Sequence, residues 1–213
     1  MDKQIFDTIS SFGLYNINNS IKLQYPITGI SNGINIQAFI DFSKLDFDTF
    51  DTIYVYDFDK LNNIIRTFDF NIEINEDNFL ELTKDSKKSK YILSNEKTVI
   101  DDSDYNLHKT LNSIDSYFEF DISKEDIDKL KKSILLFNED IKIDKDSIKV
   151  GNFKLNYSTT KAETDLSSIL KIDYTDFLKI PTTDYIFKIF KNTNDYILLL
   201  KHEHLDIILP LKQ

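Results

Sequence analysis

Hydrophobic and polar residues along the chain follow one pattern that occurs four times, about every 50 residues. Each copy combines an amphipathic helix, with apolar residues three or four positions apart, and about three short strands, with apolar residues at alternate positions. The predicted helices cover 2–14, 57–68, 123–137 and 173–180. A unit of this kind cannot bury its apolar face alone, so the copies are expected to pack on one another.

The predicted strands are short and fill the intervals between the helices. They lie near 20–24, 27–31, 34–42, 52–56, 70–75, 78–83, 87–93, 118–122, 140–144, 147–150, 152–157, 166–172, 184–190, 195–201 and 205–210. Alternation, clearest in 71–75 and 140–144, predicts one covered face and one solvent-exposed face. The sequence therefore predicts an α+β fold of two similar domains, each with two helices packed on antiparallel sheets.

Three of the predicted helices begin at residues that are suited to cap a helix. Ser123 stands three residues before Asp126, as in a capping box, and Asp57 and Asp173 open two other helices. These residues support the predicted starts of the helices.

The four copies group into two domains. Residues 1–93 hold the first two copies, and residues 117–213 hold the last two. The segment 94–116 between them is polar, has no sustained apolar period and lacks Gly and Pro. We therefore predict an ordered connecting loop rather than a flexible tether.

Composition and charge describe an ordinary globular protein with an acidic balance. Hydrophobic residues make up 41% and charged residues 29%, and the formal net charge is −10. A negative net charge disfavours binding to nucleic acid, but it does not exclude binding at a local basic surface. Arg66 is the single arginine, so bidentate contacts to guanine are nearly absent and any DNA contact should be independent of sequence.

The chain also lacks cysteine, which excludes disulfides and thiolate metal sites. The amino terminus has no signal-peptide pattern, and no apolar run approaches the roughly 18 residues that span a bilayer. We expect a soluble cytoplasmic protein with no membrane partner.

Four segments carry short motifs in a fixed order, at 50–65, 74–93, 122–130 and 179–185. The first leads from a strand through Tyr-Asp-Phe into a helix, the third reads Ile-Ser-Lys-Glu-Asp-Ile-Asp-Lys-Leu, and the fourth reads Lys-Ile-Pro-Thr-Thr-Asp-Tyr. In order and spacing, nearly the whole chain resembles the DNA polymerase sliding clamps of T-even-like bacteriophages, which are processivity clamps similar to proliferating cell nuclear antigen. One departure is Thr182, where that family often has Gly.

The resemblance implies a DNA clamp fold and a particular assembly. Identical subunits would form a closed homotrimeric ring that encircles double-stranded DNA without regard to sequence and tethers the replicative DNA polymerase. A clamp loader would be a further partner, no cofactor is implied, and the setting would be the cytoplasm of an infected bacterial host. Exposed edge strands support ring closure independently, because pairing between subunits removes them.

A ring that slides needs many weak contacts to phosphates, so its inward helices should carry cations. The candidate DNA-facing residues on these helices are Lys3, Lys60, Arg66, Lys124, Lys129, Lys131 and Lys132. The alternative is that Glu125–Lys129 and Asp128–Lys132 are merely helical pairs on a solvated face.

The resemblance also places the contacts between subunits and with partner proteins. The subunit interface would join 87–93 of one subunit to 163–169 of the next, with opposite charges facing each other. The residues assigned to it are Lys87, Lys88, Lys90, Tyr91, Glu163, Asp165 and Leu166. A groove for the apolar tails of partner proteins would be lined by Tyr105, Leu107, Ile208, Leu209, Pro210 and Leu211, unless these residues simply pack the core.

No pattern in the sequence points to catalysis. Acidic residues are scattered over helix starts and loops, and no glycine-rich phosphate loop or nucleophile motif accompanies them, so we predict a protein that is not an enzyme. His202 and His204 stand two apart on a predicted strand, but no third ligand is near in sequence, and no metal site is predicted.

Two other functions remain open at this stage. One is a processivity factor of clamp fold that holds DNA on a basic face without forming a ring. The other is a structural or scaffold protein of the virion that uses the repeated unit for assembly and binds no DNA.

Overall fold

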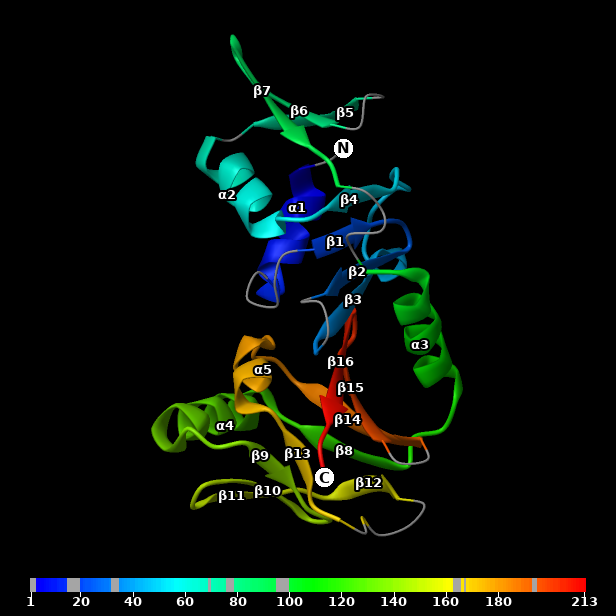
Figure 1. The fold of residues 1–213 in the computed structure, drawn as a ribbon, viewed down its shortest axis with the longest axis vertical. Coiled ribbons are helices and arrows are strands. Elements are labelled where there is room, and N and C mark those ends of the chain that lie inside the picture. The colour runs from blue at the N-terminus through cyan, green and yellow to red at the C-terminus, as the bar shows by residue number, and fades with distance from the viewer. Residues whose placement is uncertain are drawn as a thin grey trace. The chain divides into compact units, whose positions relative to one another are not determined.

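The computed structural model describes residues 3–14, 20–31, 35–68, 70–75, 79–94, 100–162, 166, 168–192 and 195–213. The chain divides into two compact units, Met1–Tyr105 and Asn106–Gln213, which are described separately below. Figure 1 shows the order of the helices and strands within each unit.

Unit 1 combines helices with two antiparallel groups of strands (Figure 1). Its elements in chain order are α1 (Lys3–Ser11), β1 (Ser20–Leu23), β2 (Ile27–Ser31), β3 (Gln37–Asp41), the short 3-10 helix η2 (Phe42–Lys44), β4 (Ile53–Val55), α2 (Phe58–Phe68), β5 (Asn71–Asn75), β6 (Phe79–Lys84) and β7 (Lys87–Ile92). The strands β3, β2, β1 and β4 lie side by side in that order, and β5, β6 and β7 form a separate sheet.

The helices of unit 1 bury one apolar stripe each. On α1 the buried residues include Phe6 and Ile9, and on α2 they include Phe58 and Ile65. The rings of Phe6 and Phe58 stack with their centroids 5.9 Å apart, so the two helices pack on each other. Asp57 caps α2 by accepting a hydrogen bond from the backbone N–H of Lys60 at 3.0 Å, as predicted.

Unit 2 repeats this plan of helices combined with two groups of strands (Figure 1). Its elements are β8 (Phe118–Ile122), α4 (Lys124–Phe137), β9 (Ile141–Ile143), β10 (Ser147–Val150), β11 (Phe153–Asn156), β12 (Thr159–Ala162), β13 (Leu170–Ile172), α5 (Tyr174–Lys179), β14 (Tyr185–Asn192), β15 (Asp195–Lys201) and β16 (Leu205–Leu211). The strands β12, β8, β14, β15 and β16 are neighbours in that order, and a four-stranded sheet has the order β11, β10, β9, β13.

Helix α4 packs on the four-stranded sheet and against α5. Its apolar stripe buries Ile127, Leu130 and Ile134, each worth about 1.5 to 3 kcal/mol of transfer free energy. Ser123 caps the helix by accepting a hydrogen bond from the backbone N–H of Asp126 at 3.2 Å, which confirms the predicted capping residue. Asn138, which adopts the left-handed conformation, caps the carboxyl end of the helix.

The segment 94–116, predicted to be a loop, contains a helix, α3 (Asp102–Ser113), and the division between the units falls inside it. The prediction was wrong because α3 lacks a full apolar stripe: Leu111 is its one buried residue. The start of α3 is instead stabilised by a capping side chain. Asp101 accepts hydrogen bonds from the backbone N–H groups of Ser103 and Asp104, at 2.8 and 3.2 Å.

The other predicted helices and strands are present, with ends that differ by a few residues. The largest difference is the strand predicted at 166–172, of which the structure shows β13 at Leu170–Ile172. Strand β12 was not predicted. Among the described residues, no helix combines the length and the apolar character that crossing a membrane would require.

Candidate functional sites

Helix α4 carries the densest group of candidate DNA-facing cations. Lys124, Lys129 and Lys132 are exposed on it. The Nζ atom of Lys132 lies 2.6 Å from Asp128, as the helical-pair alternative predicted, whereas Lys129 pairs with Asp126 at 2.8 Å. Exposed pairs of this kind contribute about 0.3 to 0.5 kcal/mol, so an incoming phosphate can compete for either lysine.

Lys131 differs from its neighbours on α4. It is half-buried, and its ammonium group donates a hydrogen bond to the backbone carbonyl of Ile180. Burial lowers the pKa of Lys131 from its ordinary value. The structure therefore uses Lys131 to join α4 to the end of α5, and its charge is less accessible than those of the exposed lysines.

The remaining candidate cations lie on the helices of unit 1. Lys60 and Arg66 are exposed on α2, and Lys3 is half-exposed near the start of α1. On α2, Lys60 lies opposite the stripe that buries Leu61 and Ile65, and Arg66 lies at the flank of that stripe.

Basic residues are concentrated on the four helices that pack on the sheets. The helices α1, α2, α4 and α5 together hold eight basic and six acidic residues. The rest of the chain holds 18 basic and 30 acidic residues. The helices thus carry a mild positive charge while the remaining sequence is strongly acidic.

Strand β7 is an edge strand of its sheet and presents the predicted interface lysines. Lys87, Lys88 and Lys90 are exposed. Lys88 pairs with Glu81 at 2.8 Å, and the ammonium group of Lys90 lies 4.1 Å from the centre of the Phe79 ring. The neighbouring Tyr91 is half-buried, and its hydroxyl donates to the backbone carbonyl of Asp57 at 3.0 Å.

The other half of the predicted interface is only partly visible. Glu163 and Asp165 lie outside the described residues, and Leu166 is half-buried between β12 and β13, outside any strand. In the described part of unit 2, the four-stranded sheet instead ends at the edge strand β11.

Large apolar side chains are exposed near these edges. In unit 1, Ile92 at the end of β7 is 82% exposed and Phe68 at the end of α2 is 52% exposed. In unit 2, Leu135 and Leu136 near the end of α4 are 73% and 76% exposed. Such residues are candidates for contact with another molecule.

The predicted groove residues are largely engaged within their own units. Tyr105 packs edge-on against Phe39, with ring centroids 5.4 Å apart, and its hydroxyl donates to the backbone carbonyl of Lys22 at 3.4 Å. Burial raises the pKa of Tyr105. Leu107 is half-buried. On β16, Ile208, Leu209 and Leu211 are buried and Pro210 is exposed, so packing within the fold accounts for most of this set.

A polar network that the sequence did not reveal surrounds Asp206 on β16. Its carboxylate accepts hydrogen bonds from Asn112 at 3.0 Å and Lys201 at 3.0 Å, and it lies 2.8 Å from Nε2 of His108. Burial opposes ionisation of Asp206, but these hydrogen bonds and the Lys201 charge hold its pKa below the usual range. The carboxylate therefore connects the second half of α3 to β15 and β16.

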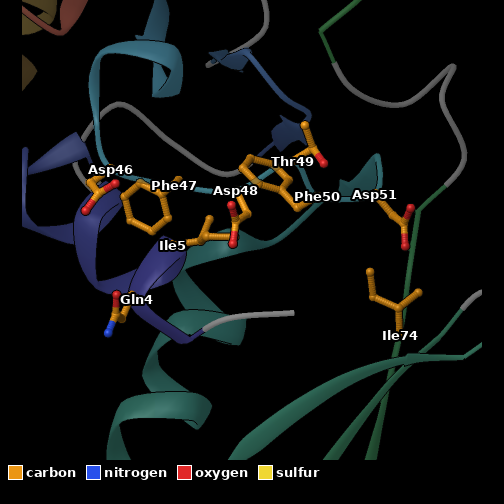
Figure 2. Close-up of a pocket in the computed structure, with 9 residues that line it drawn as sticks. All are labelled: Gln4, Ile5, Asp46, Phe47, Asp48, Thr49, Phe50, Asp51 and Ile74. Atoms are coloured by element: carbon orange, nitrogen blue, oxygen red, sulfur yellow. The ribbon is translucent and has the colours of Figure 1, made fainter.

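A pocket of about 340 Å³ lies in unit 1 beside the start of α1 (Figure 2). Figure 2 shows Asp46 and Asp51 at opposite ends of its lining, with Ile5, Phe47 and Phe50 between them. The exposed carboxylates make the pocket unsuited to an anion.

His202 and His204 were predicted to lie on a strand, but they occupy the turn between β15 and β16, because the backbone N–H of His202 bonds to the carbonyl of Leu205 at 2.8 Å. Nowhere in the described ranges do three or more His, Cys, Asp or Glu side chains gather as metal ligands would.

Comparison of the structure with solved structures finds close similarity of fold. Proliferating Cellular Nuclear Antigen from Entamoeba histolytica matches with a TM-score of 0.59 and 12% identity, over 98% of this chain and 95% of that chain. A putative DNA polymerase III beta subunit from Eubacterium rectale matches with a TM-score of 0.66 and 11% identity, over 100% of this chain and 64% of the other.

The Helicobacter pylori beta clamp bound to a DNA ligase peptide matches with a TM-score of 0.62 and 12% identity, over 99% of this chain and 63% of that chain. The chain thus spans less than two thirds of these two bacterial proteins but nearly all of the Entamoeba protein. No protein-family model and no curated protein sequence matches it. The chain has the DNA clamp fold, an α+β fold with helices packed on antiparallel sheets, as predicted.

Proposed function

We propose that this protein is a DNA sliding clamp, a processivity factor without enzymatic activity that encircles duplex DNA and tethers a DNA polymerase. The clamp fold is compatible with this function, and the observation that supports it most directly is the distribution of charge between the helices and the rest of the chain. Eight of the fourteen charged residues on α1, α2, α4 and α5 are basic, in a chain whose net charge is −10. Mild positive charge on helices suits weak contacts to phosphates that permit sliding.

The residues proposed to meet DNA are those on the exposed faces of these helices. Lys60, Arg66, Lys124, Lys129 and Lys132 are exposed, and each can reach a phosphate without breaking more than an exposed ion pair. Lys3 contributes from the start of α1. Lys131 is proposed to contribute least, because its ammonium group already bonds to Ile180.

Closure of the ring is proposed to use two of the edge strands, with β11 in place of the predicted segment 163–169. Strand β7 of one subunit would pair with β11 of the next, so that backbone groups left unpaired in one chain find partners. The exposed Ile92 and Phe68 on one side, and Leu135 and Leu136 on the other, would supply the apolar part of the interface. Lysines occur on both strands, so apolar burial and strand pairing, rather than opposite charges of β7 and β11, would hold the edges together.

The proposed assembly is a homotrimer, as the resemblance to phage clamps implies. Two units per chain match nearly the whole Entamoeba protein, and three chains would supply six units. The partners proposed are a replicative DNA polymerase and a clamp loader, and the motif resemblance points to a T-even-like bacteriophage replicating in the bacterial cytoplasm. Partner tails are proposed to bind the groove that the resemblance implies, where Pro210 is exposed; the similar Helicobacter clamp is bound to a DNA ligase peptide.

Two measurements test the proposal. Light scattering at micromolar concentration should give three times the mass of one chain. With a clamp loader and ATP, the protein should be retained on nicked circular DNA at high salt and released when the circle is cut, because a closed ring leaves only over a free end.

The outcomes separate the alternatives. If the protein is retained equally on circular and linear DNA and is released from both by salt, it holds DNA on a basic face without forming a ring. A stable oligomer that neither binds DNA nor lengthens polymerase products would indicate a scaffold protein.

A further inference from the structure

Five lysines form a straight row across the four-stranded sheet of unit 2. Lys154 is paired with Lys149, Lys149 with Lys142, and Lys142 with Lys171. The backbone of Lys171 in turn forms an antiparallel bridge with Lys212. Residues directly opposite on neighbouring strands point to the same face, and strands lie about 4.8 Å apart, so this lysine row is about 19 Å long.

The lysine row occupies the face of the sheet opposite to α4. The residues that flank the row along the strands are buried on the helix-covered face; they are Ile141, Ile143, Ile148, Val150, Leu170 and Ile172. Because side chains alternate along a strand, the lysines between them point away from the helices. The row is therefore separate from the helical surface proposed to meet DNA.

The row is destabilising by itself, because like charges directly opposite each other on adjacent strands repel. Three of its lysines are partly neutralised by ion pairs, which are Lys149–Asp144 at 3.1 Å, Lys142–Glu139 at 3.6 Å and Lys212–Asp173 at 3.1 Å. Within the described ranges, Lys154 and Lys171 have no ion pair. A chain with 36 acidic residues has nonetheless placed only basic residues along this line.

We propose that the lysine row binds an acidic segment of a partner protein, held in an extended conformation across the strands. Side chains on one side of an extended peptide repeat about every 6.8 Å, so three carboxylates fit along the row. This site goes beyond the proposed function and does not depend on it.

The shape and chemistry of the row favour a peptide over nucleic acid. The row is one residue wide and is bordered by Glu139, Asp144 and Asp173, which would repel the broad charge of a duplex but leave room for a single extended chain. It contains no arginine for bidentate phosphate contacts and no aromatic ring on which bases of a single strand could stack.

The test uses fluorescence anisotropy of the full chain with a labelled peptide of alternating glutamate and serine, about ten residues long, at low salt. The row variant is the double substitution Lys154→Gln and Lys171→Gln. The matched control is Lys124→Gln with Lys132→Gln, which removes the same charge from α4 on the opposite face. A peptide of alternating glutamine and serine, and a short DNA duplex, are measured alongside.

The row variant should bind the acidic peptide roughly five- to tenfold more weakly than the natural chain, and the α4 control should bind it unchanged. Thermal unfolding of the row variant should be unchanged or slightly higher, because repulsion is relieved, so weaker binding cannot come from misfolding. The proposal is overturned if the natural chain does not bind the acidic peptide, if the row variant binds it equally well, or if the row variant loses affinity for the duplex instead.

Discussion

Nε2 of His108 on α3 lies 2.8 Å from the carboxylate of Asp206 on β16, although the two residues are 98 positions apart in the chain. Asn112, one helical turn after His108, donates to the same carboxylate oxygen at 3.0 Å. Both side chains are largely buried, with 13% of His108 and 11% of Asp206 exposed. One carboxylate thus fixes the second half of a helix that buries little apolar surface of its own.

The first prediction concerns this carboxylate. Asp206→Ala should lower the free energy of unfolding by about 2 to 4 kcal/mol at neutral pH, because the donors on His108, Asn112 and Lys201 lose a largely buried acceptor. Urea unfolding measures the loss. Asp195→Ala, an exposed change on the neighbouring strand, should cost no more than about 0.5 kcal/mol.

The pH dependence of stability has a definite sign at Asp206. Its pKa is lower in the folded protein than in the unfolded chain, so its contribution is present above the unfolded value of about 3.9 and is lost as pH falls through the folded value. The natural chain should therefore lose more stability than Asp206→Ala between neutral pH and pH below about 4. Equal losses for both proteins would contradict the assigned pKa.

The second prediction concerns Gly151, in the turn between β10 and β11. Its φ is +54°, and a Cβ there would lie 2.5 Å from the ring of Phe137. Gly151→Ala should destabilise the fold by about 2 to 4 kcal/mol, from backbone strain together with displacement of the ring. Gly13 is a matched control, since its φ is +70° but no atom lies within 4 Å of the added Cβ. Gly13→Ala should cost about 1 kcal/mol, and equal costs at both sites would exclude the steric contribution of Phe137.

Local patterns predicted those elements whose apolar residues have a clear period. Examples are the alternation in β9 and the apolar stripe on α4 that includes Ile127 and Leu130. Each element buries one face, and the spacing of its apolar residues shows this in the sequence. Caps such as Ser123 and Asp57 are equally local, since donor and acceptor lie three residues apart.

Elements and sites that rest on distant contacts were not predicted. Helix α3 has one buried side chain, Leu111, and depends on polar contacts such as those of Asp206, which no periodicity shows. His202 and His204 were assigned to a strand although they fall between the predicted strands 195–201 and 205–210, and they lie in the turn between β15 and β16. The sequence pattern does not show the lysine row either, because its members come from four different strands and from Lys212 after β16, and only strand pairing brings them into line.

The third prediction separates lysines on α4 by their access to DNA. Lys124→Gln should weaken binding to duplex DNA and reduce the slope of log affinity against log salt by about one, because one phosphate contact is lost. Lys131→Gln should change the slope little, since the ammonium group of Lys131 is held by the carbonyl of Ile180. The slopes are measured by anisotropy over a salt series, with Lys109→Gln on α3 as the control. A larger effect at Lys131 than at Lys124 would reverse the assignment.

The last prediction tests the proposed subunit interface through its exposed apolar residues. In a single chain, Ile92→Asp and Leu135→Asp should each change stability by no more than about 0.5 kcal/mol, because both side chains are mostly exposed. In a ring, each substitution would bury a carboxylate without a partner, which costs several kcal/mol per interface. Light scattering should therefore show both variants as monomers at concentrations where the natural chain is a trimer. Ile114→Asp is the control, because Ile114 is also exposed, at 52%, but follows α3 and belongs to none of β7, β11 and α4. If both interface variants keep the trimer mass, subunits must meet through a surface other than β7 and the end of α4.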